Sequence, residues 1–195
     1  DDEVYQRFRA QVRDPDWQRE ILQQPVAERV KLAKDARDAS AEHKGKAGMD
    51  IMDVNAGEVA AAVTIPLLHL ADATAERILE AGFDRVGLLG TRYTMEQDFY
   101  TGRLRGAGID VRVPGAEGRA MVNRVIYEEL CHGVVRETSR EAFLETIGEL
   151  VANGAQAIIE GCTEIVMLVQ QEHTRVPLFD TTAIHARQAV AEALK

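Results

Sequence analysis

Short apolar runs alternate with helical patterns from about residue 59 to the end of the chain. The apolar runs predict buried strands over residues 65–69, 85–90, 110–114, 155–160 and 176–179. The pattern at 110–114 is the weaker one and indicates a strand nearer an edge of the sheet. Strands that alternate with helices are typical of an α/β domain, here with a parallel sheet.

The helical patterns between these runs carry start and stop signals. A helix that begins near residue 72 can end at Gly82 in the left-handed conformation that glycine favours. Capping boxes that predict helix starts occur at Thr94 with Gln97 and at Thr138 with Glu141. Apolar stripes predict further helices over residues 121–130, 143–151, 165–171 and 182–195.

The first 58 residues have a different pattern, with helical spacing and no strand-like run. Pro15 and Pro25 mark helix starts, which predicts two or three short helices before a mobile connection at 39–48. The chain therefore divides into a helical segment, 1–58, and an α/β domain, 59–195. The apolar stripes of residues 1–38 would expose hydrophobic area unless another surface packed against them. We therefore expect either dimerisation, giving a homo-oligomer, or contact with the α/β domain.

Composition narrows the function classes. Hydrophobic residues make up 46% and charged residues 28%, as in ordinary globular proteins, and the net charge of −9 argues against nucleic-acid or anionic-membrane partners. No apolar stretch has the length of a transmembrane segment, so a cytoplasmic protein is expected. The two cysteines, Cys131 and Cys162, are too few for a disulfide framework and have no metal-ligand spacing, so no metal site is expected.

Cys162 is the strongest candidate for chemistry. It follows the apolar run 157–160 in a Gly-Cys-Thr turn, and a helical pattern begins directly afterwards. This context places the thiol at the carboxyl end of a strand, where α/β sheets bind ligands, and at the positive end of a helix. The sequence therefore predicts a thiolate in a crevice.

Several segments of the α/β part resemble one known family. They are Ile65 to His69, Ala71 to Ala75, Val86 to Tyr100, Gly161 to Ile165 and Pro177 to Thr182. Together these segments are similar to the cofactor-independent aspartate and glutamate racemases, especially the aspartate or broad-specificity amino-acid racemase branch. The resemblance implies a flavodoxin-like parallel-sheet fold, a small amino-acid substrate and no cofactor such as pyridoxal phosphate.

In this family two cysteines work from opposite sides of the substrate, one removing the α-proton and the other delivering a proton to the opposite face. Cys162 matches the second cysteine, whereas Gly48 to Ile51 stands where the first is expected. The resemblance also suggests Thr91, Thr94, Thr163 and Glu164 as substrate-binding residues. Thr91 and Thr94 are equally well explained as helix caps, and Thr163 and Glu164 as residues that complement the following helix.

Residues 1–58 resemble a second family, the helical cap of UDP-diacylglucosamine diphosphatase, an enzyme of lipid A synthesis. The carrying segments are Asp2 to Ala10 and Asp50 to Asn55. The chain therefore reads as a chimera: by fold and motifs an amino-acid racemase that retains only the second catalytic cysteine, with weak or absent activity. The alternatives are a non-enzymatic scaffold or assembly protein and, less favoured, a remnant of a metal-dependent UDP-sugar-lipid pyrophosphohydrolase.

Three other residues have ordinary structural explanations. Cys131 adjoins the apolar stripe that ends at Leu130, which predicts a packing function. His69 and His185 do not belong to a recognisable pair of base and nucleophile. We therefore expect both histidines to be hydrogen-bonded in or near the core rather than catalytic.

Overall fold

The computed structural model describes residues 56, 60 and 67–194. The chain divides into two compact units, Asp1–Leu67 and Leu68–Lys195, and all elements named below belong to the second. The helices predicted within residues 1–38 and the predicted boundary at residue 58 lie outside the described residues. The second unit carries every candidate site residue.

Four parallel strands form the sheet of this unit. They are β1 Arg85–Leu89, β2 Asp110–Arg112, β3 Ala157–Glu160 and β4 Leu178–Asp180, in the order β2-β1-β3-β4. The two central strands, β1 and β3, are buried almost throughout, whereas β2 lies at an edge, as predicted. The α/β class and the parallel sheet are confirmed. Leu67, Leu68 and His69 do not form the strand predicted for 65–69; they precede a helix.

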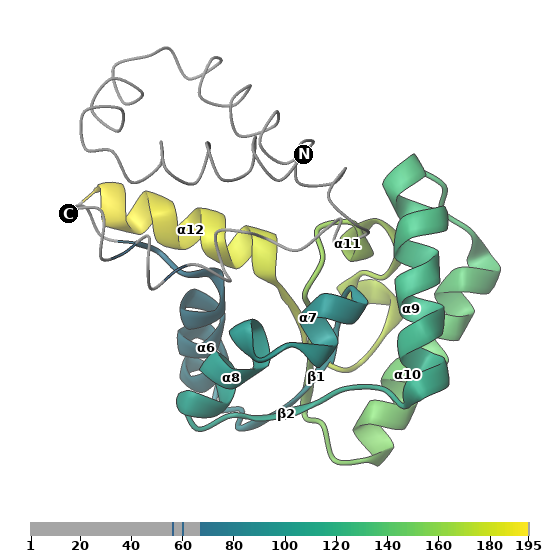
Figure 1. Ribbon diagram of the computed structural model, residues 1–195, viewed down its shortest axis with the longest axis horizontal. Coiled ribbons are helices and arrows are strands. Elements are labelled where there is room, and N and C mark those ends of the chain that lie inside the picture. Colours follow the sequence, from purple (N-terminus) through teal and green to yellow (C-terminus); the bar gives the residue numbers. More distant parts are fainter. Residues whose placement is uncertain (1–55, 57–59, 61–66, 195) are drawn as a thin grey trace, which may run out of the picture. The chain divides into compact units, whose positions relative to one another are not determined.

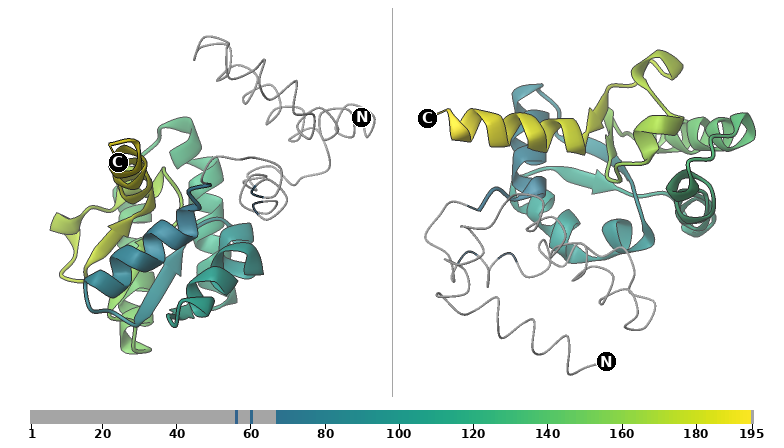
Figure 2. Two further views of the ribbon diagram at one scale, coloured as in Figure 1. Left: turned by 90° about the vertical axis from the view of Figure 1, so that its left-hand side faces the viewer. Right: turned by 90° about the horizontal axis from the view of Figure 1, so that it is seen from above.

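Helices cover both faces of the sheet. They are α6 Leu70–Glu80, α7 Arg92–Glu96, α8 Asp98–Gly106, α9 Ala116–Glu128, α10 Glu137–Ala152, α11 Ile165–Leu168 and α12 Thr181–Ala193, with short 3-10 turns η1 Leu130–His132 and η2 Gln171–His173. Figure 1 shows α6, α8 and α12 on one side of the strands and α9 and α10 on the other. The last helix, α12, packs on α6, as Figures 1 and 2 show. None of the helices in the described residues is long and apolar enough to cross a membrane.

The helix starts differ from the predicted capping boxes. Thr91, rather than Thr94, caps α7, and the extended backbone of Gln97 then separates α7 from α8, so one predicted helix is two. The helix α10 begins at Glu137 without a side-chain cap, so the second predicted box is also wrong. By contrast, Gly82 has the predicted left-handed backbone, with a φ of 81°.

Close helix-to-sheet packing fixes the two central strands. A Cβ atom on Gly87 of β1 would lie 2.6 Å from Ile158 Cδ1 and 2.9 Å from Leu150 Cδ1. A side chain there would force Ile158 and Leu150 to shift, so the glycine lets α10 pack closely on β1 beside β3. On the opposite side of the core, the rings of Phe83 and Phe179 meet edge to face at 6.0 Å.

Candidate active site

The candidate site lies where β1 and β3 end. Leu89 pairs in register with Glu160, and the Gly161 amide, one residue later, donates a hydrogen bond of 2.7 Å to the Leu89 carbonyl. The turns that follow the two strands therefore lie side by side, and they bring Thr91 and Cys162 to the same edge of the sheet. In open parallel sheets this edge is where ligands bind.

Two glycines allow the turns to approach each other closely. A Cβ atom on Gly161 would lie 3.0 Å from the Leu89 carbonyl oxygen and 3.2 Å from Thr94 Cγ2, and one on Gly90 would lie 3.1 Å from Thr94 Cγ2. The Thr94 methyl group thus packs against both glycines. This contact links the turn after β1 to the turn that carries Cys162.

The hydroxyl groups of Thr91 and Thr94 form a pair beside these glycines. Their Oγ1 atoms are 3.1 Å apart, and Thr91 Oγ1 also accepts the Thr94 amide at 3.4 Å. A hydrogen bond of 2.8 Å from the Arg92 amide to Asn123 Oδ1 ties this turn to α9. The capping explanation of Thr91 is confirmed, while the suggested contact of both threonines with substrate stays a prediction.

Cys162, Thr163 and Glu164 form one hydrogen-bonded group. The thiol of Cys162 donates to Glu164 Oε2 over 2.9 Å, and the Thr163 hydroxyl donates to the same oxygen over 2.7 Å. Cys162 is partly buried and packs against the hydrophobic core. Three of the five predicted site residues therefore contact one another directly.

The environment of Cys162 favours the protonated thiol. Burial, the hydrogen bond to Glu164 and its negative charge together raise the pKa of Cys162 to about 12. For Glu164, partial burial acts against ionisation, but the hydrogen bonds from Cys162 and Thr163 outweigh it and lower the pKa. The proton therefore resides on sulfur and the charge on the carboxylate.

The predicted helix-activated thiolate is wrong for this arrangement. The helix that follows, α11, has only 4 residues, and Glu164 itself occupies its N-cap position. A carboxylate at the start of the helix interacts favourably with the helix dipole and holds the thiol proton. The Glu164 backbone amide at the start of this helix does lower the pKa of the Cys162 thiol, but burial and the Glu164 carboxylate outweigh that contribution.

Tyr127 on α9 and Cys131 in η1 interact electrostatically with this group. Burial, followed by electrostatic repulsion from Cys162, Cys131, Tyr93 and Glu164 in their ionised forms, raises the pKa of Tyr127 on α9. Cys131 in η1 is exposed rather than packed, which corrects the sequence interpretation, and burial together with Glu164 raises its pKa. The predicted apolar stripe of α9 excluded Tyr127, and no sequence signal placed either residue near Cys162.

Glu160 is a second residue that the sequence did not single out. It is the last residue of β3 and only 4% exposed. Burial and the nearby negative charge of Asp180 raise the pKa of Glu160 to about 7. The sequence pattern identified Glu160 only as the last residue of a strand and gave no sign that its carboxyl group is buried.

The two histidines have the structural functions predicted for them. His69 is buried and caps α6, its Nδ1 atom accepting the Ala71 amide at 3.1 Å. His185 Nε2 lies 3.0 Å from the Leu68 carbonyl oxygen. Neither histidine has a hydrogen bond to Cys162 among these contacts. Within the described residues, no group of His, Cys, Asp and Glu side chains has the arrangement of a metal site.

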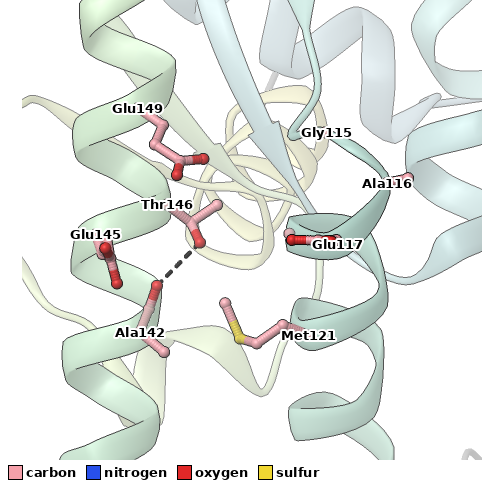
Figure 3. A pocket seen from close by; sticks show the side chains of 9 residues that line it. Gly115, Ala116, Glu117, Met121, Ala142, Glu145, Thr146 and Glu149 are labelled. Carbon is pink, nitrogen blue, oxygen red and sulfur yellow. Dashed lines mark hydrogen bonds between the residues drawn. The ribbon is translucent and has the colours of Figure 1, made fainter.

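A separate groove of about 470 Å³ lies between α9 and α10. Figure 3 shows Met121 on α9 and Thr146 on α10 near its centre, with Glu117, Glu145 and Glu149 around them. The Thr146 hydroxyl donates to the carbonyl of Ala142 within its own helix. None of the residues lining this groove belongs to the Cys162 group, so the groove is distinct from the candidate site.

The chain is similar over most of its length to proteins of one racemase family. The profile of the Asp/Glu/Hydantoin racemase family matches residues 52–189. A Yersinia pestis protein assigned to the Asp/Glu racemases is 47% identical, with a TM-score of 0.73 over 86% of this chain and 79% of its own. An aspartate racemase homologue from Pyrococcus horikoshii OT3 is 32% identical, with a TM-score of 0.71 over 90% of this chain and 80% of its own.

Curated relatives point to two different proteins. UDP-2,3-diacylglucosamine hydrolase of Bordetella pertussis is 44% identical over 63 residues, which are 32% of this chain and only 24% of the hydrolase. The broad specificity amino-acid racemase RacX of Bacillus subtilis is 26% identical over 137 residues, 70% of this chain and 59% of RacX. Both resemblances inferred from the sequence are thus present. Because the family profile covers more than half of the chain and the solved racemase-like structures share its fold, the chain belongs to the Asp/Glu/Hydantoin racemase family.

Proposed function

We propose that this chain is a cofactor-independent amino-acid racemase of the aspartate/glutamate type in which Cys162 is the retained acid-base group and turnover is weak or absent. The observation that carries the proposal is the Cys162–Glu164 hydrogen bond of 2.9 Å at the carboxyl end of the central strands. Thr91, Thr94 and Thr163 supply hydroxyl groups at the same edge for a substrate carboxylate. Glu164 supplies the negative charge that an α-ammonium group would contact.

The chemistry of this group explains why turnover would be weak. Removal of an α-proton requires the Cys162 thiolate, with the proton passing from Cα to sulfur and the electron pair remaining on the substrate. A pKa of about 12 leaves little thiolate at neutral pH, and Glu164 holds the thiol proton rather than removing it. An ammonium group beside Glu164 would weaken this hold and favour ionisation of the thiol.

Solvent exchange at Cα tests the proposal. L- and D-aspartate and L- and D-glutamate are incubated with the protein in D2O, and the α-proton signal is followed by NMR. A single acid-base group works on one face only, so we expect slow deuterium exchange of one enantiomer with little inversion. The exchange should disappear in Cys162→Ser and persist in Cys131→Ser, which removes the exposed thiol instead.

Two results would contradict the proposal. Exchange that survives Cys162→Ser would assign the chemistry to another group. Absence of exchange for all four substrates would leave the family membership intact and remove the catalytic part.

The second candidate function is that of a non-enzymatic chimeric scaffold. It is favoured by the similarity of 63 residues to a hydrolase of which this chain spans about a quarter, in a chain that also matches the racemase family. Robust turnover of any of the four amino acids in the exchange experiment would exclude this reading.

A further inference from the structure

Glu160 is a buried acid that the proposed reaction does not use. Its side-chain oxygen Oε1 is fully buried and has no hydrogen-bond partner among the described residues. A buried polar atom normally has a partner, because leaving it unpaired costs free energy and leaving it charged costs far more. The position therefore calls for a neutral carboxyl group.

The neighbours of Glu160 do not compensate a negative charge. On β4 the residue in register is Asp180, another acid, and on β1 it is Leu89. The short helix α11 contains only Ile165, Val166, Met167 and Leu168. The guanidinium of Arg140 on α10 donates instead to the Leu168 carbonyl and to Glu137. Burial and Asp180 accordingly raise the pKa of Glu160 to about 7, so that the group changes its charge near neutral pH.

Hydrogen bonds fix the backbone at Glu160 on one side to α12 and on the other to the turn of the candidate site. Its carbonyl accepts a hydrogen bond of 2.8 Å from the Thr181 hydroxyl. The next residue, Gly161, donates to the Leu89 carbonyl over 2.7 Å and lies against the Thr94 methyl group. Gly161 therefore has little space in which to move, and any shift of the backbone at Glu160 would disturb its contacts with Leu89 and Thr94.

We propose that Glu160 is a positioning residue whose neutral carboxyl group keeps the end of β3 in place, and whose ionisation loosens the Gly161–Cys162 turn and exposes the Cys162 thiol. The residue acts through Gly161 and does not touch the reacting atoms. The inference goes beyond the proposed function, since it concerns the access of reagents to the thiol and its test needs no turnover.

Alkylation of Cys162 by iodoacetamide across pH 6 to 9 provides the test, in full-length protein carrying Cys131→Ser so that a single thiol reacts. A thiol with a high pKa reacts about tenfold faster for each added pH unit. In the Cys131→Ser protein we expect the alkylation rate to rise additionally around pH 7. By pH 8.5 the rate should be about threefold or more above the tenfold-per-unit line. Glu160→Gln, which stays neutral, should follow the line throughout, and Glu149→Gln on the exposed side of α10 should keep the extra rise.

Superimposable profiles with and without Glu160→Gln would overturn the proposal, as would an extra rise that persists in that variant. If Glu160→Gln does not fold, hydrogen exchange in the unsubstituted protein gives the same decision. The exchange rate of the Gly161 amide, divided by that of the Ile158 amide bonded to Pro177, should increase above pH 7. A constant ratio would refute the coupling, whatever the outcome of the racemase assay.

Discussion

The Cys162 thiol donates a hydrogen bond of 2.9 Å to the Glu164 carboxylate and keeps its proton on sulfur. Reactive cysteines usually lie beside a cation or a free helix N-terminus, which stabilises the thiolate. Here an anion two residues away in the chain does the reverse. The group is therefore held with the Cys162 thiol protonated and the Glu164 carboxylate charged.

Replacing Glu164 with Gln should make the Cys162 thiol more acidic. The variant removes the negative charge and the strong acceptor but leaves the burial, so the pKa should fall toward the ordinary value without reaching it. In a Cys131→Ser background we expect iodoacetamide to alkylate Cys162 at pH 8 about tenfold faster. Glu145→Gln, an exposed change on α10, serves as the control, and an unchanged or slower rate in Glu164→Gln would contradict the prediction.

Glu160 should make the folded protein less stable as the pH rises. Its folded pKa of about 7 exceeds the ordinary value of 4.5, so the folded state binds the proton more tightly than the unfolded state. Both states are protonated well below pH 4.5, and the penalty develops between there and about pH 7, reaching about 3 kcal/mol. Urea unfolding of Glu160→Gln should show its stability relative to wild type increasing by up to that amount between pH 4 and pH 8. A difference that is the same at both pH values would speak against a neutral buried Glu160.

Gly161→Ala should destabilise the protein and disturb the site together. The added Cβ would lie 3.0 Å from both Leu88 Cδ1 and the Leu89 carbonyl oxygen, so one of the two turns must move. We expect a loss of about 1–3 kcal/mol, measured by urea unfolding. Gly148→Ala is the matched control, because nothing lies within 4 Å of the new Cβ on that helix, and a gain of roughly 0.5–1 kcal/mol is expected there. Equal effects of the two changes would show that the Gly161 contact is not tight.

Thr91→Ala should cost about 1 kcal/mol of stability, because the cap of α7 is lost. Thr91→Ser keeps the hydroxyl group and should restore nearly all of it. If Thr91 also binds substrate, Ser should likewise restore the Cα exchange rate, whereas Ala should lower it beyond what unfolding explains. Thermal unfolding of the three proteins separates the two contributions, and an Ala variant as stable as wild type would rule out the capping interaction.

Periodicity made most of the fold predictable. Apolar runs of strand length located β1, β3 and β4, and apolar stripes located α9 and α10, because burial on a sheet or on one helix face imposes a distinct spacing. The helix starts were less predictable. The Thr94–Gln97 spacing fits a capping box, but the extended backbone at Gln97 ends one helix and starts the next, a choice made by packing rather than by local sequence.

The candidate site was only partly predictable. Cys162 could be chosen from its turn after a strand, and Thr163 and Glu164 are its chain neighbours. The hydrogen bond from the Cys162 thiol to Glu164 depends on side-chain directions that the sequence does not give. This bond favours the protonated thiol, whereas the sequence predicted a thiolate. Cys131 and Tyr127 interact electrostatically with Cys162 from another part of the chain, and Glu160 owes its raised pKa to burial and to the negative charge of Asp180. No spacing in the sequence encodes these relations.

The pairing of β1 with β3 also governs how the protein is made. The two strands join residues about 71 positions apart, as in the hydrogen bond from the Arg85 amide to Gln156. Closing so long a loop costs chain entropy before any contact compensates for it, so we expect the site to assemble late in folding. During synthesis, the edge of β1 that pairs with β3 stays unpaired until β3 has been made. An unpaired apolar strand edge can form hydrogen bonds with other chains. A chain interrupted before Ala157 is therefore expected to aggregate rather than to fold into a smaller domain.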